Sequence, residues 1–199
     1  MDFSQYPSFT FSRRGRVLTA AIHSENGRNS VDEQLHDDLA RVFYDLNRDP
    51  DSDVIVLTGT GRFFCAGGDM DWFQEMIDEP ARWLAEVVPM AKAIISGLLE
   101  LEKPIICRLN GAAAGLGASI ALMCDVIISA EKVKIGDPHV AMGLVAGDGG
   151  AIITNDAKLA ERIESLRVYG KVTPTDAAER NFHHDPKYLS LRVGMNSRL

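Results

Sequence analysis

The sequence predicts an α/β fold, and three observations indicate it. Short, uniformly apolar runs at 54–57, 105–107 and 126–128 have the length and composition of buried strands. Helix-like stretches alternate with these runs, and two glycine-containing stretches, 63–69 and 110–117, stand where an apolar run gives way to a helix. With 199 residues, of which 46% are hydrophobic, the chain is long enough to bury a sizeable core.

The amino-terminal part predicts a β-hairpin followed by an amphipathic helix. Strand-like stretches at 10–12 and 17–23 flank the turn-forming residues 13–16. Ser30 to Glu33 has the pattern of a capping box, which marks the start of a helix. Apolar residues follow at helical spacing: Val31, Leu35, Leu39, Val42, Phe43 and Leu46.

The middle of the chain repeats the order of strand, turn and helix. Residues 80–101 are expected to be helical, with an interruption or kink near Pro89, and lead into the strand at 105–107. A helix of small residues at 118–123 precedes strands at 126–128 and 133–135. In such folds functional sites gather at the carboxyl ends of the strands, where both glycine stretches lie.

Composition narrows the classes of partner and location. The net charge is −7 and the basic residues are scattered, which argues against nucleic acid and against an anionic membrane surface. No apolar segment approaches the roughly 18 residues of a membrane span, and the first residues do not have the pattern of a signal peptide. The three cysteines are odd in number and form no CxxC pair, so we expect no zinc site and a reducing, cytoplasmic location.

The two glycine stretches predict a specific chemical site. Each presents backbone N–H groups at the start of a helix, and two such ends can converge on one oxygen. This arrangement suits an oxyanion hole for a carbonyl compound, most naturally a thioester that passes through an enolate. The alternative is that the small residues only permit tight turns and close helix packing.

Several ordered pieces of the sequence carry a family resemblance. They are Phe63 to Asp69, Lys103-Pro104, Asn110 to Gly117, Cys124-Asp125 and Gly136 to His139, continuing through Gly143 to Gly150. Together, over about 140 residues, they resemble the crotonase (enoyl-CoA hydratase/isomerase) family. The resemblance implies a spiral of ββα units, an acyl-CoA thioester substrate in which coenzyme A is part of the substrate, no separate cofactor, and a homo-trimer or hexamer.

The resemblance also assigns roles to backbone groups. The oxyanion-hole donors fall on the N–H groups of Gly68 and Leu116. Ala66 falls where the family's backbone holds the adenine of coenzyme A. Gly27 and Arg28 fall on the loop that lines the coenzyme A channel, where Arg28 is either a phosphate ligand or a solvated surface charge.

Asp69, which closes the first glycine stretch, is grouped with these substrate-binding residues.

The acid–base residues depart from the family pattern. Family hydratases use two glutamates, and the corresponding positions here are Ser119 and His139. A serine hydroxyl does not act as a base near pH 7, whereas a histidine does. His139, with Asp148 as its orienting partner, forms a pair like that of the family members that cleave carbon–carbon bonds of β-diketones. His23 would be a third residue of this set.

Three interpretations of these departures remain open. The chain is an acyl-CoA enzyme of altered mechanism, a His/Asp-dependent β-diketone hydrolase, or a catalytically impaired subunit that serves in binding or assembly. The alternative to an active pair is that His139 caps a helix and Asp148 supports a turn.

The carboxyl-terminal residues carry a second resemblance. Beyond Gly150 the crotonase pattern is lost, so we expect a core at 1–150 and an atypical helical segment at 151–199. Residues 147–199 resemble a fragment of the pyridoxal-phosphate-dependent sugar aminotransferases. Lys132 and Lys134 lack the context of that family's Schiff-base lysine, so we expect no working pyridoxal site.

Overall fold

The computed structural model describes residues 1–25 and 27–139 of the chain. Strands β1 (Phe9–Arg14) and β2 (Val17–Ile22) form the predicted antiparallel hairpin, in register from Phe9 opposite Ile22 to Arg14 opposite Val17. Gly15 closes its turn with a φ of 58°, a left-handed conformation that glycine adopts without steric cost. The predicted hairpin is therefore confirmed.

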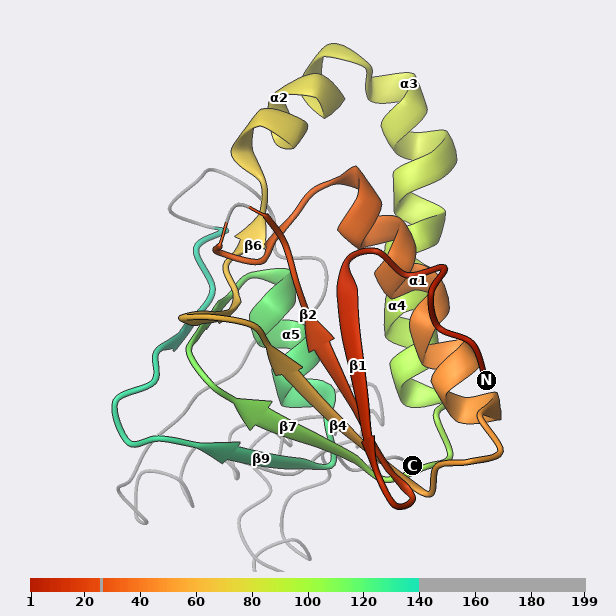
Figure 1. Cartoon of the computed structure of the whole chain (residues 1–199). Helices are drawn as coiled ribbons and strands as arrows, with labels where there is room; N and C mark the ends of the chain where they lie inside the picture. Colours follow the sequence, from red (N-terminus) through yellow and green to blue (C-terminus); the bar gives the residue numbers. More distant parts are fainter. Residues whose placement is uncertain (26, 140–199) are drawn as a thin grey trace, which may run out of the picture.

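The hairpin belongs to a five-stranded sheet in the order β1-β2-β4-β7-β9 (Figure 1). Strands β4 (Val54–Gly59), β7 (Ile105–Leu109) and β9 (Val126–Ser129) contain the three apolar runs and join β2 in parallel. Parallel neighbours need crossover connections, which the helices supply. The predicted α/β class is confirmed.

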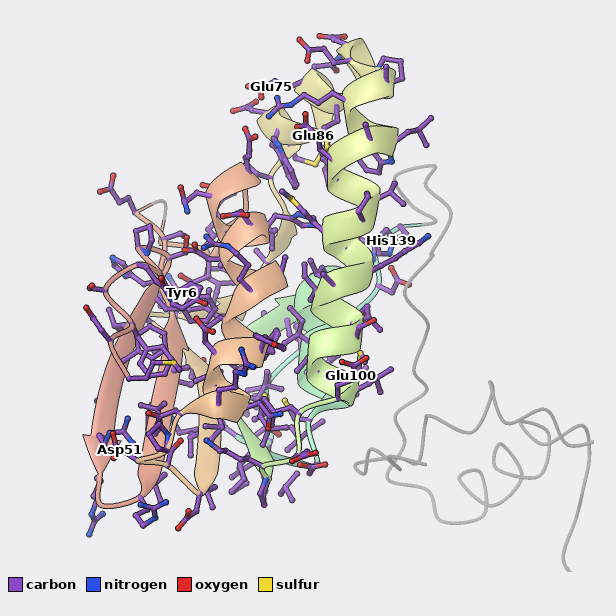
Figure 2. The ribbon with its side chains drawn as sticks, turned by 90° about the vertical axis from the view of Figure 1, so that its right-hand side faces the viewer. Tyr6, Asp51, Glu75, Glu86, Glu100 and His139 are labelled. Carbon is purple, nitrogen blue, oxygen red and sulfur yellow. The ribbon has the colours of Figure 1, made fainter. Side chains whose placement is uncertain are left out.

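Only one face of this sheet is covered by the described helices. In both views, α1 (Glu33–Arg48) and α4 (Val88–Leu99) lie on the same side of the sheet (Figures 1 and 2). On β4 the side chains of Ile55 and Leu57 are fully buried, whereas the alternating Val54 and Val56 are half-buried. Among the described residues this predicted buried strand is therefore more deeply buried on one face than on the other.

The first long helix begins later than the capping box predicted. Asp32 is the N-cap of α1, and its carboxylate accepts a hydrogen bond from the Leu35 N–H at 2.8 Å. Ser30 cannot serve as the cap because Ser30–Val31 forms β3, which pairs in parallel with β6 (Gly67–Gly68). Pairing between distant segments overrides the local capping signal.

The helix expected at 80–101 is divided into α3 (Pro80–Arg82), a π-helical turn η1 (Trp83–Val87) and α4. The Val88 N–H donates to the Trp83 carbonyl five residues earlier, which widens the turn just before Pro89. Proline lacks an N–H and its ring clashes with the preceding turn, so the irregularity lies where it was predicted.

Both glycine stretches contribute strands as well as turns. Strands β5 (Phe63–Cys65), β8 (Ala112–Ala114) and β10 (Ile135–Gly136) form a small parallel sheet in the order β10-β8-β5. Helix α2 (Met70–Asp78) follows the first stretch, and α5 (Leu116–Met123) follows the second. The small sheet therefore brings together two segments about fifty residues apart, together with the end of the described chain.

Candidate active site

The first glycine stretch leaves one backbone donor turned away from its neighbouring strand. The Asp69 N–H donates to the Val31 carbonyl at 2.9 Å, and Val31 lies opposite Gly68 in the β3–β6 ladder. In a parallel ladder the bonds of Val31 go to the residues on either side of its partner, so the N–H of Gly68 points away from β3. Gly67 makes the turn possible with a φ of 86°.

The second glycine stretch places a free donor at the start of α5. The Gly115 N–H donates to the Gly136 carbonyl at 3.1 Å, and the Gly115 carbonyl accepts the Ser119 N–H at 3.0 Å. Leu116 is the first residue of α5, and its cap Gly115 has no side chain to accept its N–H. The first N–H groups of a helix have no acceptor within the helix, so the Leu116 N–H is available to a ligand.

Close backbone contacts hold the two stretches together. A Cβ on Gly67 would lie 2.9 Å from the Ala114 carbonyl oxygen. A Cβ on Gly117 would lie 2.5 Å from the Cys65 carbonyl oxygen and 2.8 Å from the Cys65 Sγ. Only glycine fits at either position, and the start of α5 therefore rests directly on β5. The two predicted oxyanion-hole donors are adjacent to these contact points in the chain: Gly68 follows Gly67, and Leu116 precedes Gly117.

His139 lies beside the junction of the two stretches. A Cβ on Gly115 would lie 3.6 Å from Cε1 and 3.8 Å from Nε2 of the imidazole, and 3.9 Å from the Gly67 Cα. The His139 side chain is 19% exposed. Figure 2 shows it on the opposite side of the molecule from Tyr6. The structure thus brings together the predicted donors and the predicted acid–base residue.

The described partner of His139 is Asp137. Its carboxylate accepts the His139 backbone N–H at 3.0 Å and contacts the imidazole Nδ1 through the same Oδ1 atom. The hydrogen bond from the backbone, together with that from the ring, lowers the pKa of the Asp137 carboxyl group. Asp148, to which the sequence analysis gave this role, lies outside the described residues.

The residues predicted to bind coenzyme A also meet. The Ala66 N–H donates to the Arg28 carbonyl at 3.2 Å, so the loop of Gly27 and Arg28 lies against the first glycine stretch. Gly27 has a φ of 69°, and the Arg28 side chain is exposed.

Asp69 has a structural role at the start of α2. Its carboxylate caps α2 by accepting the N–H groups of Asp71 at 3.0 Å and Trp72 at 3.4 Å. The carboxylate is thereby engaged in a helix cap, and its grouping with the substrate-binding residues stays a prediction.

Ser119 lies one turn into α5 and is half-buried, with its hydroxyl donating to the Gly115 carbonyl at 3.4 Å. His23 is exposed and its Nδ1 lies 3.2 Å from the Thr60 hydroxyl.

Asn29 is a buried asparagine whose structural role was not predicted from the sequence. Asn29 is 0% exposed, accepts the Ser24 N–H at 3.1 Å and donates to the carbonyls of Thr60 at 3.1 Å and Phe63 at 2.9 Å. Its φ of 53° is tolerated better by asparagine than by most residues. Asn29 therefore ties the Gly27–Arg28 loop to the start of β5. The position of an asparagine directly after Gly27-Arg28 was the sequence signal that could have indicated this role.

Among residues 1–25 and 27–139, no helix is long and apolar enough to cross a membrane. In the same part of the chain no His, Cys, Asp or Glu residues are grouped as metal ligands. Burial raises the pKa of the Cys65 thiol to about 11, which keeps this neighbour of Gly117 uncharged.

Comparison with known proteins identifies relatives of this chain. The model of the enoyl-CoA hydratase/isomerase family matches residues 13–180. The 2,3-dehydroadipyl-CoA hydratase of Escherichia coli (strain K12) is 32% identical over 139 residues, which cover 70% of this chain and 52% of that protein. The 1,2-epoxyphenylacetyl-CoA isomerase of the same organism is 34% identical over 135 residues, which cover 67% of this chain and 52% of that protein. The chain thus spans about half the length of these curated relatives.

Solved structures agree with the sequence match. The crystal structure of an enoyl-CoA hydratase/isomerase from Mycobacterium paratuberculosis has a TM-score of 0.69 and 28% identity, and the match covers 94% of this chain and 70% of that one. The family match ends at residue 180 and so includes part of the segment 151–199 that we expected to be atypical. The resemblance of residues 147–199 to aminotransferases lies outside the described residues and stays a prediction, as does the boundary at 150. The chain belongs to the enoyl-CoA hydratase/isomerase (crotonase) family.

Proposed function

We propose that this protein is an acyl-CoA enzyme that forms a thioester enolate and moves a proton with a single base, His139. The observation that carries the proposal is that Gly115 lies next to both the His139 imidazole and Gly67, and that Gly115 and Gly67 directly precede the predicted donors Leu116 and Gly68. Two fixed N–H donors favour an enolate oxygen over a ground-state carbonyl, and each is worth about 3 kcal/mol in comparable oxyanion holes.

The proposed reaction is a shift of a double bond. The Nε2 lone pair of His139 takes a proton from the carbon next to the thioester carbonyl, and the electron pair of that C–H bond moves onto the carbonyl oxygen. The imidazolium then returns the same proton to a different carbon of the conjugated enolate, and the carbonyl re-forms. The substrate and the product are isomers, and the base is regenerated.

Isomerisation is favoured over hydration by the residues at the two acid–base positions. Hydration by the family's two glutamates activates water with one carboxylate and protonates carbon with the other. By the family resemblance Ser119 corresponds to one of these positions, and its hydroxyl donates to the Gly115 carbonyl. One base suffices to move a proton, and we therefore expect weak hydration of crotonyl-type thioesters.

A second candidate is hydrolysis of a cyclic β-diketone by a histidine held by a carboxylate. The contact between Asp137 and His139 favours it, with Asp137 in the place that we assigned to Asp148.

The decisive measurement is exchange of the α-protons of an acyl-CoA thioester with deuterated water, followed by NMR. Exchange reports enolate formation without requiring that the natural acyl group be known. We expect His139→Ala to lower the exchange rate by about 10²- to 10⁴-fold. The control is His23→Ala, which removes an exposed histidine that contacts Thr60. An unchanged exchange rate in His139→Ala contradicts the one-base proposal, and hydrolysis of a β-diketone without thioester exchange favours the second candidate.

The donor assignment has its own test at Leu116. Proline is well tolerated at the first position of a helix, so Leu116→Pro keeps α5 while removing the donor N–H. Leu116→Ala is the matched control because it loses the same side-chain contacts and keeps the N–H. We expect a loss of about 10²- to 10³-fold in the proline variant only. Equal exchange rates in the two variants contradict the oxyanion-hole assignment.

A further inference from the structure

We propose that Asp137 is a positioning residue that holds the His139 imidazole with its proton on Nδ1 and its lone pair on Nε2. The proposal rests on the proposed function of His139 as a base. It assigns to a residue two positions away in the chain the role that sequence reasoning gave to Asp148.

The first support is the double contact of one carboxylate oxygen. Oδ1 of Asp137 accepts the backbone N–H of His139 at 3.0 Å and also contacts the ring Nδ1. An ionised carboxylate only accepts hydrogen bonds, so the ring nitrogen facing it carries a proton. In the neutral imidazole the other nitrogen, Nε2, then holds the lone pair.

The second support is where Nε2 lies. A Cβ added to Gly115 would lie 3.8 Å from this Nε2 atom and 3.9 Å from the Gly67 Cα. The lone pair therefore lies at the junction of the glycine stretches, next to the start of α5. A base at this place is close to the carbon next to the thioester carbonyl, when the two N–H donors hold the carbonyl oxygen.

The third support is the rigidity of the segment that carries the pair. Gly136, immediately before Asp137, pairs with Ala114 in the β8–β10 ladder and accepts the Gly115 N–H at 3.1 Å. Pro138 follows, and a proline disfavours helical backbone in the residue before it. The Asp-Pro-His segment is thus anchored to the second glycine stretch, and a short turn keeps the carboxylate near the ring.

The carboxylate also stabilises the charge that develops on His139. When Nε2 takes a proton the ring becomes an imidazolium, and the hydrogen bond from Nδ1 to Asp137 becomes charge-assisted. The carboxylate remains ionised throughout, because its pKa is lowered by the contacts from His139. Asp137 itself therefore transfers no proton.

The experiment compares two variants of Asp137 with a matched control. Asp137→Ala removes both contacts, whereas Asp137→Asn keeps a carbonyl oxygen that can accept from Nδ1–H but loses the charge. The control is Asp2→Ala, since Asp2 accepts the N–H of Ser4 at 2.9 Å with the same two-residue spacing and has no histidine beside it.

The first readout is the tautomer of His139, measured by ¹⁵N NMR on the full chain without substrate at a pH where the ring is neutral. We expect the Nδ1–H form in the parent, in Asp137→Asn and in Asp2→Ala, and a mixture of both forms in Asp137→Ala. An Nδ1–H form that persists in Asp137→Ala overturns the proposal. Because no turnover is required, this readout decides the question even when the proton-exchange assay fails.

The second readout is turnover of an acyl-CoA that shows proton exchange. We expect a fall in kcat of about 10-fold or more in Asp137→Ala, with KM nearly unchanged and a smaller fall in Asp137→Asn. A rise in KM with constant kcat would assign Asp137 to substrate binding and overturn the positioning role.

Discussion

Replacement of Gly117 by alanine adds one methyl group at the point where α5 rests on β5. The new Cβ would lie 2.5 Å from the carbonyl oxygen, 2.6 Å from the Cβ and 2.8 Å from the Sγ of Cys65. Ordinary contact begins near 3.4 Å, so the helix must move by about 3.4 − 2.5 = 0.9 Å relative to the strand. The nearest atom belongs to the backbone, which cannot rotate out of the way.

Two effects of this displacement are expected. Overpacking of this kind costs about 1–3 kcal/mol of the free energy of unfolding. The greater helix propensity of alanine offsets roughly 0.5–1 kcal/mol of that cost. The Leu116 N–H moves with the helix relative to Gly68, and a misplacement of about 1 Å at a catalytic group lowers a rate by about 10²-fold.

Urea-induced unfolding measures the first effect, and α-proton exchange of an acyl-CoA measures the second. The matched control is Gly97→Ala in α4, where the nearest atom to the added Cβ is Phe43 Cβ at 3.2 Å, so that only a small adjustment is needed. A second variant, Gly117→Ala with Cys65→Ala, should remain impaired because the Cys65 carbonyl oxygen is still in place. Parent-like stability and exchange in Gly117→Ala would refute the close contact between α5 and β5.

Three further predictions concern side chains around the site. Burial lowers the pKa of His36 to about 4, so the unfolded chain binds more protons than the folded chain between about pH 6.5 and pH 4. The contribution of His36 to the free energy of unfolding is therefore full above about pH 6.5 and falls by up to about 3 kcal/mol as the pH drops through this window. Unfolding measured at about pH 7.5 and about pH 4.5 should show a smaller pH dependence in His36→Leu than in the parent. Asp69→Ala should lower the free energy of unfolding by about 1 kcal/mol with little change in KM, and Asp69→Asn should have the stability of the parent because asparagine is also a good helix cap. A large rise in KM in both variants would indicate that Asp69 binds substrate. Asn29→Ala should cost about 1–3 kcal/mol, since it removes the hydrogen bonds from the Asn29 amide to the carbonyls of Thr60 and Phe63 and to the buried carbonyl of Phe64, and a loss below about 0.5 kcal/mol in urea unfolding would contradict that role.

Local patterns predicted most of the secondary structure and the residues that approach one another. The apolar runs became β4, β7 and β9, because a short run of β-branched residues has few alternatives in an α/β chain. The proline rule located the π-helical turn before Pro89. Prediction failed where pairing partners are distant: Ser30 entered β3 instead of capping α1, because Gly67–Gly68 offered it a ladder.

The sequence by itself determined the α/β class, the two glycine stretches and His139 as the first histidine after them. Each is encoded locally, in apolar periodicity or in residue types that are rare outside turns. Only the tertiary structure decided how these pieces are used. It placed His139 beside Gly115, made Asp137 its partner and turned Asp69 into a helix cap. The place of His139 depends on contacts between segments far apart in the chain. The contacts of Asp137 and Asp69 are local, but they depend on the exact backbone geometry, which the residue types alone do not specify.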